Sequence, residues 1–206
     1  MANEFEISGH FYELSGLKCR RYLNIKRVGS NLSQPDIMVV MMNPGSSYPL
    51  DGIDNNNAPT EAHPDPTQDQ IMAVMNNTGF NFARVLNLSD ARQPSSNKFY
   101  EFLNSGSANS IPHSIFHQSR HDEFSALFRQ GVPTIYGWGV NSNLEGLARK
   151  AIDRISEKNP IGIRKNGIEW AYYHPLPRIH AKQVEWVNTV SALLSNVPEP
   201  GSVLAL

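Results

Sequence analysis

Three side chains that can donate or accept hydrogen bonds follow hydrophobic runs of the sequence. Asn43 comes after "VVMM", Asn87 after "ARVL", and His174 after "WAYY". An asparagine carboxamide donates and accepts at once, which suits the polar edge of a nucleobase. A neutral histidine can donate to an oxygen on which negative charge develops. Trp138 or Tyr48 could stack on a flat ring. Together these residues predict a site for a planar, polar ligand.

Each of these residues also has a structural interpretation. Asn43 stands before a proline and could be a turn residue, and Asn87 could cap the turn after its run. Trp138 could anchor the core, and His174 could be an ordinary packed or exposed histidine. The functional interpretation therefore depends on whether the fold brings these positions together.

Four hydrophobic runs are typical of strands, and amphipathic segments between them are typical of helices. The expected strands cover residues 37–42, 82–88, 133–139 and 167–173, and the expected helices cover residues 65–78, 121–131, 144–156 and 182–195. This alternation predicts an α/β fold with a central, mainly parallel, four-stranded sheet. Because the carboxyl ends of parallel strands share one edge, we expect Asn43, Asn87, Trp138 and His174 to meet there.

The remaining segments are expected to surround this sheet. Residues 3–28 predict an N-terminal β-hairpin within an extension of residues 1–34, and residues 196–206 predict a tail. Residues 46–66 and 94–112 predict polar loops, the second with a short helix at 97–104. The length of 206 residues fits one domain over the whole chain, residues 1–206.

Composition narrows the class of protein. The net charge of −1 provides no general attraction for nucleic acid, so such a partner would need a local basic patch. The single cysteine, Cys19, excludes an intramolecular disulfide, and "MANEFEISGH" lacks the pattern of a signal peptide. No apolar run reaches the ~20 residues of a membrane helix. We expect a cytoplasmic protein without a membrane partner.

The ordered motifs resemble those of the uracil-DNA glycosylase superfamily. The matching segments are Asn43-Pro44-Gly45, "VLNL" around Asn87, Trp138-Gly139 and His174-Pro175-Leu176-Pro177-Arg178. The resemblance implies a three-layer sandwich with the sheet in the middle. It also implies that Asn43 orients water, that His174 donates to the departing base, and that Asn87, Tyr48 and Trp138 bind the base. Arg92, Lys98 and Arg178 would then hold phosphates near the same edge.

A nearer resemblance is to an uncharacterised bacterial and phage family known as a domain of unknown function. It extends over nearly the whole chain through Arg21-Tyr22, Asn43-Pro44, Asp65-Pro66-Thr67, Asn87-Leu88 with Arg92, Trp138-Gly139 and His174-Pro175-Leu176. This second family implies no particular reaction.

Two departures from the glycosylase pattern leave the activity open. Asn43 stands where the best-known enzymes have a water-activating aspartate, and asparagine cannot take a proton. Leu176 replaces a serine that would hold a DNA phosphate. The chain therefore predicts either hydrolysis of an N-glycosidic bond, in DNA or a nucleotide, or binding of a nucleobase, nucleotide or nucleic acid without chemistry. An unrelated small ligand is a third interpretation.

No cofactor or metal is expected. His63 and Asp65, with Asp51 and Asp54 nearby, could gather a divalent ion, but their spacing fits no standard site. Asp65 is better interpreted as the cap of the helix that follows. The oligomeric state is not predicted.

Overall fold

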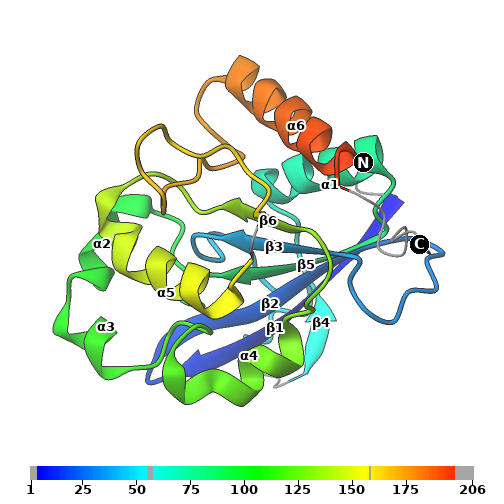
Figure 1. The fold of residues 1–206 in the computed structure, drawn as a ribbon. Coiled ribbons are helices and arrows are strands. Elements are labelled where there is room, and N and C mark those ends of the chain that lie inside the picture. The colour runs from blue at the N-terminus through cyan, green and yellow to red at the C-terminus, as the bar shows by residue number, and fades with distance from the viewer. Residues whose placement is uncertain (1–3, 55–57, 158, 198–206) are drawn as a thin grey trace, which may run out of the picture.

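The computed structural model describes residues 4–54, 58–157 and 159–197. Six strands form one sheet in the order β4-β1-β2-β5-β3-β6 (Figure 1). Their bounds are β1 (Phe5–Leu14), β2 (Leu17–Arg27), β3 (Ile37–Met41), β4 (Pro59–Glu61), β5 (Phe82–Asn87) and β6 (Thr134–Gly137). Strands β5, β3 and β6 are parallel, whereas β2 is antiparallel to β5.

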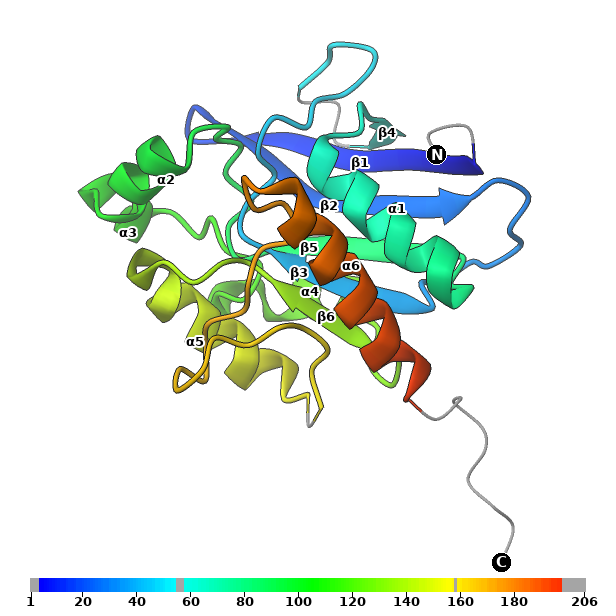
Figure 2. The same ribbon diagram turned by 90° about the horizontal axis from the view of Figure 1, so that it is seen from above.

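Helices cover both faces of the sheet. Their bounds are α1 (Pro66–Thr78), α2 (Ser96–Leu103), α3 (Gly106–Ser110), α4 (His121–Leu127), α5 (Glu145–Ile155) and α6 (His180–Ser195). Figures 1 and 2 show α1 and α6 side by side over one face, with α2, α4 and α5 on the other. Strand β3 is buried on both sides: Val39 and Met41 pack toward α1 and α6, and Met38 and Val40 pack toward the opposite layer. The chain is therefore a three-layer α/β structure.

The predicted four-stranded sheet is wrong in two respects. The N-terminal hairpin is not an extension beside the sheet, because β2 pairs along β5 from Leu23↔Val85 to Lys26↔Phe82 and makes the sheet mixed. The expected strand at 167–173 is absent from the described residues. Turns interrupt that segment, and its strand-like pairing within the described residues is limited to the isolated bridges of Tyr172 with Gly139 and Arg164.

The helix predictions fared better. Helix α1 begins after Asp65 and ends before Gly79, whose φ of 80° is the left-handed conformation that glycine adopts easily. Helix α4 stops at Leu127, earlier than expected, because Phe128 leaves the helix and stacks on Phe124 with 5.1 Å between ring centroids. Neither α3 nor β4 was predicted. The predicted tail falls largely on residues 198–206, which lie outside the described residues.

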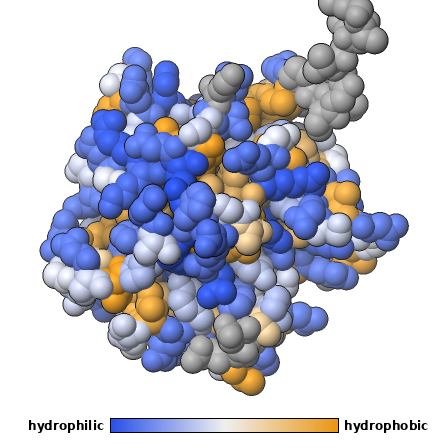
Figure 3. Space-filling view, turned by 60° about the horizontal axis from the view of Figure 1, so that its bottom comes forward, coloured by the Kyte–Doolittle hydropathy of each residue, from blue (hydrophilic) through white to orange (hydrophobic). Residues whose placement is uncertain are grey.

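Two surface properties bear on partners. None of the helices in the described part of the chain has both the length and the apolar character needed to cross a bilayer. On the face shown in Figure 3, hydrophilic side chains surround smaller groups of apolar ones.

Candidate functional site

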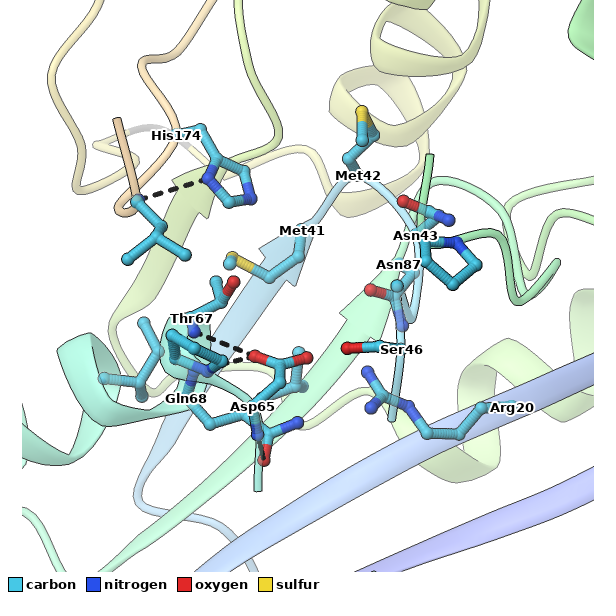
Figure 4. A pocket seen from close by; sticks show the side chains of 16 residues that line it. Arg20, Met41, Met42, Asn43, Ser46, Asp65, Thr67, Gln68, Asn87 and His174 are labelled. Atoms are coloured by element: carbon cyan, nitrogen blue, oxygen red, sulfur yellow. Dashed lines mark hydrogen bonds between the residues drawn. The ribbon is translucent and has the colours of Figure 1, made fainter. Parts of the chain in front are cut away.

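The carboxyl ends of three parallel strands meet at one edge of the sheet. In the register of the sheet, Met41 at the end of β3 pairs with Asn87 of β5 and with Gly137 of β6. A cavity of about 230 Å³ opens at this edge, and Asn43, Asn87 and His174 all line it (Figure 4). The structure thus brings together the three hydrogen-bonding residues that the sequence singled out.

Asn87 is the most unusual of these residues. It is 0% exposed, yet among the described residues neither its Nδ2 nor its Oδ1 has a hydrogen-bond partner. Leaving a buried polar group unpaired costs about 1–3 kcal/mol. A ligand that presents both an acceptor and a donor would remove this cost.

A ligand can reach Asn87 only if a neighbouring side chain moves, because the carboxamide is completely covered. Met41 and Met42 line the same cavity. Methionine is unbranched and adapts to irregular spaces, so these two side chains are suited to repacking around a ligand.

Asn43 is held in place by the loop that follows β5. Its Nδ2 donates to the carbonyl oxygens of Ala91 at 3.2 Å and Gln93 at 2.8 Å. The carboxamide nitrogen is therefore occupied, which leaves the Oδ1 atom to accept from a ligand or a water molecule. The turn after Asn43 includes Gly45 at φ 61°, a conformation that favours glycine.

His174 is positioned by a close approach of the chain to the end of β6. A Cβ atom on Gly137 would lie only 3.2 Å from Cδ of Pro175, so glycine lets this segment pack against the strand. The Nδ1 atom of His174 accepts from the backbone N–H of Leu176 at 3.1 Å, which assigns the ring proton to Nε2. Burial lowers the pKa of His174 to about 4, so the ring is neutral at pH 7 and can donate from Nε2.

Asp65 also lines the cavity, and the sequence favoured a capping role for it over that of a metal ligand. The capping role is confirmed: Oδ1 accepts from the N–H groups of Thr67 at 2.8 Å and Gln68 at 3.2 Å. The Oδ2 atom remains and lies 3.8 Å from where a Cβ atom on Gly45 would be. The cavity therefore contains a carboxylate that comes from a different segment than Asn43.

Gln68 completes a reciprocal cap and adds another unpaired group. Its Oε1 accepts from the backbone N–H of Asp65 at 3.2 Å. Its Nε2 is buried and has no partner among the described residues. The sequence pattern for a capping box predicts the first contact but cannot show that the amide nitrogen is left at a cavity.

The two residues predicted to stack on a base lie outside the cavity lining. Trp138 is 0% exposed in the core against α5, and its Nε1 donates to the carbonyl oxygen of Trp170 at 2.8 Å. It therefore belongs to the core and not to the cavity wall. Tyr48 is 47% exposed, and its ring packs on His63 with 4.3 Å between centroids.

The residues predicted to bind phosphate also lie outside the lining. Arg92 forms an ion pair with Asp54 and donates to the carbonyl oxygen of Ser47 at 2.8 Å, so its side chain fixes loops. Lys98 is exposed on α2, and Arg178 is exposed before α6. Instead the cavity contains Arg20, a basic residue that the sequence did not single out.

The possible cation site in the long loop does not form among the described residues. Within them, no three His, Cys, Asp or Glu side chains are grouped so as to hold a metal ion. Asp51 accepts from Thr60 and from the N–H of Ile53, and Asp54 pairs with Lys18 at 2.5 Å. These carboxylates are therefore engaged in loop contacts.

Comparisons with known proteins give no match: no family model, no curated protein and no solved structure is similar to this chain. The resemblances that the motifs suggest remain predictions. Any function has to be derived from the cavity itself.

Proposed function

We propose that the cavity binds a nucleobase and that the protein hydrolyses the N-glycosidic bond joining this base to a sugar. The observation that carries the proposal is the buried carboxamide of Asn87, whose donor and acceptor both lack partners among the described residues. The edge of a nucleobase carries neighbouring donors and acceptors that a carboxamide can match. The cavity volume of about 230 Å³ lies just below the ~300–1,000 Å³ of sites for drug-sized molecules, which favours a ligand no larger than one nucleotide.

His174 supplies the group that would stabilise the departing base. As the bond between the sugar carbon and the base nitrogen breaks, its electron pair goes to the base, and negative charge spreads to a carbonyl oxygen of the base. The Nε2–H of the neutral imidazole donates to that oxygen. A fixed donor aimed at developing charge is often the largest single contribution to catalysis.

Asn43 and Asp65 supply the groups that would direct water to the sugar carbon. The free Oδ1 of Asn43 accepts from the water and orients it, while the Asp65 carboxylate accepts its proton. The water oxygen then bonds to the sugar carbon, and the proton that Asp65 accepted passes to the released base, which restores the carboxylate. Asp65 thereby provides the base that an asparagine at position 43 cannot provide.

A second candidate is binding without hydrolysis. It is favoured by one observation: Oδ1 of Asp65 already accepts two backbone N–H groups, so this carboxylate is engaged in capping α1. Both candidates require Asn87, and only hydrolysis requires the proton-accepting capacity of Asp65.

The experiment measures base release and base binding in parallel. The substrates are oligonucleotides containing uracil, hypoxanthine or mismatched thymine, together with free nucleotides, and released base is separated by chromatography. His174→Ala is expected to lower the rate of release by about 10²–10³-fold, the usual effect of losing such a donor. Asn87→Ala is expected to lose both binding and release.

Asp65→Asn is the matched variant that separates the two candidates. Asparagine caps a helix as well as aspartate does, so α1 keeps its N-terminus, but the amide cannot accept a proton. If the protein hydrolyses the N-glycosidic bond, Asp65→Asn lowers the rate of base release by about 10²–10⁴-fold while base binding persists. If the wild-type protein binds bases and releases none, the non-catalytic candidate holds. If it binds no base, both candidates are wrong.

A further inference from the structure

Arg20 is a buried cation at the edge of the cavity. It is 3% exposed, and its Nε and Nη1 atoms have no hydrogen-bond partner among the described residues. No carboxylate in that part of the chain lies within ion-pair distance of it. Burial lowers the pKa of Arg20 to about 10, which leaves the guanidinium charged at pH 7. A buried charge without a partner is costly and is seldom kept for stability.

A β-bulge explains why Arg20 faces the cavity. Along the β1–β2 pair, Gly9 stands opposite Leu23, and two residues further on Phe11 stands opposite Arg20. One residue of β1 thus faces two residues of β2, which are Arg21 and Tyr22. Without this bulge, Arg20 would point to the opposite face from Leu23, because side chains alternate along a strand. Bulges often re-aim a side chain next to a functional site.

The unpaired donors lie on one side of the cavity. Arg20 and Asn87 come from the neighbouring strands β2 and β5, and Figure 4 shows the guanidinium of Arg20 directed toward Ser46 and Asn87. Gln68 adds its buried Nε2 from α1. These groups need acceptors, and a guanidinium in particular matches the oxygens of a phosphate or carboxylate.

The two ends of the site lie on strands that are not neighbours in the sheet. His174 lies over the end of β6 and Arg20 comes from β2, so β3 and β5 lie between them. Three spacings of about 4.8 Å separate the backbones of β6 and β2 by about 14 Å. A base held at the His174 end would direct its sugar and an anionic group toward Arg20.

We propose that the natural ligand is a nucleoside monophosphate, with its base between His174 and Asn87 and its phosphate on Arg20. This proposal rests on the nucleobase-binding function above. A free nucleotide fits better than DNA, since Arg92, Lys98 and Arg178, the residues expected to hold a DNA backbone, do not line the cavity. The sugar would then lie beside Asn43 and Asp65, where the bond to the base has to be broken.

The test measures the affinity of the full chain for each nucleoside and for its own monophosphate by calorimetry. The compounds are the four common ribonucleosides and their monophosphates. The monophosphate of the preferred base is expected to bind on the order of 10–100-fold more tightly than the nucleoside, the factor of a charge-assisted hydrogen bond. In Arg20→Met this preference disappears while nucleoside affinity stays the same. Arg20→Lys retains part of the preference because the charge remains.

Arg149→Met is the matched control. Arg149 is an exposed arginine on α5, in the opposite helical layer, paired with Glu145. Its replacement is expected to leave the preference unchanged, and thermal unfolding shows whether each variant is folded. Inorganic phosphate is a further arm: if it alone binds as tightly as the nucleotide, the site takes an oxyanion only and the nucleotide proposal is wrong.

The outcomes separate this proposal from the proposed function. Nucleoside binding that Asn87→Ala abolishes, without any preference for the monophosphate, overturns the role of Arg20 and leaves the base site standing. A wild-type protein that binds neither nucleosides nor nucleotides overturns both.

Discussion

Two buried arginines on opposite faces of the sheet have different surroundings. Arg120 donates from Nη1 to Asp90 at 2.8 Å and from Nε to Glu123 at 2.6 Å. Asp90 also accepts from the hydroxyl of Tyr12 at 2.6 Å. We call these four residues, with Arg21 bound to Glu123, the Asp90 cluster. Arg20 on the other face makes no such contacts within the described residues.

The difference is visible in their proton affinities. Burial alone would lower the pKa of both guanidinium groups, but Asp90 and Glu123 raise the pKa of Arg120 above its ordinary value. For Arg20, Asp65 and Asp90 act from a distance and do not offset burial, so its pKa falls to about 10. A paired buried charge is typical of a structural network, and an unpaired one beside a cavity is typical of a ligand site.

The largest expected effect is in the Asp90 cluster. Arg120→Met removes the cation that pairs with Asp90, which is 0% exposed, and leaves this carboxylate in the core without that positive charge. We expect the free energy of unfolding to fall by about 3–5 kcal/mol. Urea denaturation measures this loss. A loss smaller than about 1 kcal/mol would mean that the Asp90 cluster does not stabilise the fold, and the contrast with Arg20 would disappear.

Acid should act on the cavity through His174. Its pKa in the folded protein is about 4, below the 6.5 of a free histidine, so the unfolded chain takes up the proton first. The stability that this burial provides is full above pH 6.5 and is lost as the pH falls through 4. The loss reaches about 3 kcal/mol near pH 4.

The measurement is the difference in unfolding free energy between the wild type and His174→Gln at several pH values. As the pH falls from 6.5 to 4, the wild type is expected to lose stability relative to His174→Gln. His121→Gln, which removes an exposed histidine at the start of α4, is the control. A difference that stays constant over this range would show that His174 is not buried as a neutral ring.

The sequence predicts that the three hydrogen-bonding residues of the candidate site meet, because of one topological rule. Asn43 and Asn87 end hydrophobic runs that form parallel strands, and parallel strands end at one edge. His174 reaches the same edge although residues 167–173 do not form the expected strand. The close packing of Pro175 on Gly137 and the bridge of Tyr172 with Gly139 hold it there, and only the folded chain shows these contacts.

The rest of the cavity depends on features that a sequence pattern does not reveal. Strand alternation places Arg20 on the wrong face, because the bulge opposite His10 depends on the pairing of β1 with β2. The cap formed by Asp65 is predictable, but the position of its second oxygen depends on the turn at Gly45. The mixed sheet likewise results from the pairing of β2 with β5, segments that are distant in the chain. An aromatic such as Trp138 fits a core or a ligand site equally well by sequence.

Arg20→Met tests the other side of the comparison. Removing a buried charge without a partner is expected to raise the free energy of unfolding on the order of 2 kcal/mol, within the range of about 1–4 kcal/mol seen when buried ionic groups become apolar. Thermal unfolding would then show a midpoint about 4–8 °C higher. If Arg20→Met instead destabilises the protein as much as is expected for Arg120→Met, both arginines have a structural role.

Asn87→Leu should give the smallest effect and the clearest sign. Removing the unpaired carboxamide recovers part of the about 1–3 kcal/mol that its burial costs, and the branched leucine forfeits some of this gain through imperfect packing. We expect a net gain of about 1 kcal/mol with complete loss of base binding, measured by urea unfolding and calorimetry on the same sample.

Asn43→Leu is the variant to compare with it. The amide nitrogen of Asn43 holds the loop at Ala91 and Gln93, so its removal is expected to lower the free energy of unfolding. If Asn87→Leu stabilises the protein and Asn43→Leu destabilises it, two chemically identical side chains of one cavity have separate roles, the first in ligand binding and the second in the fold. A loss of stability in both variants would mean that Asn87 has a structural partner.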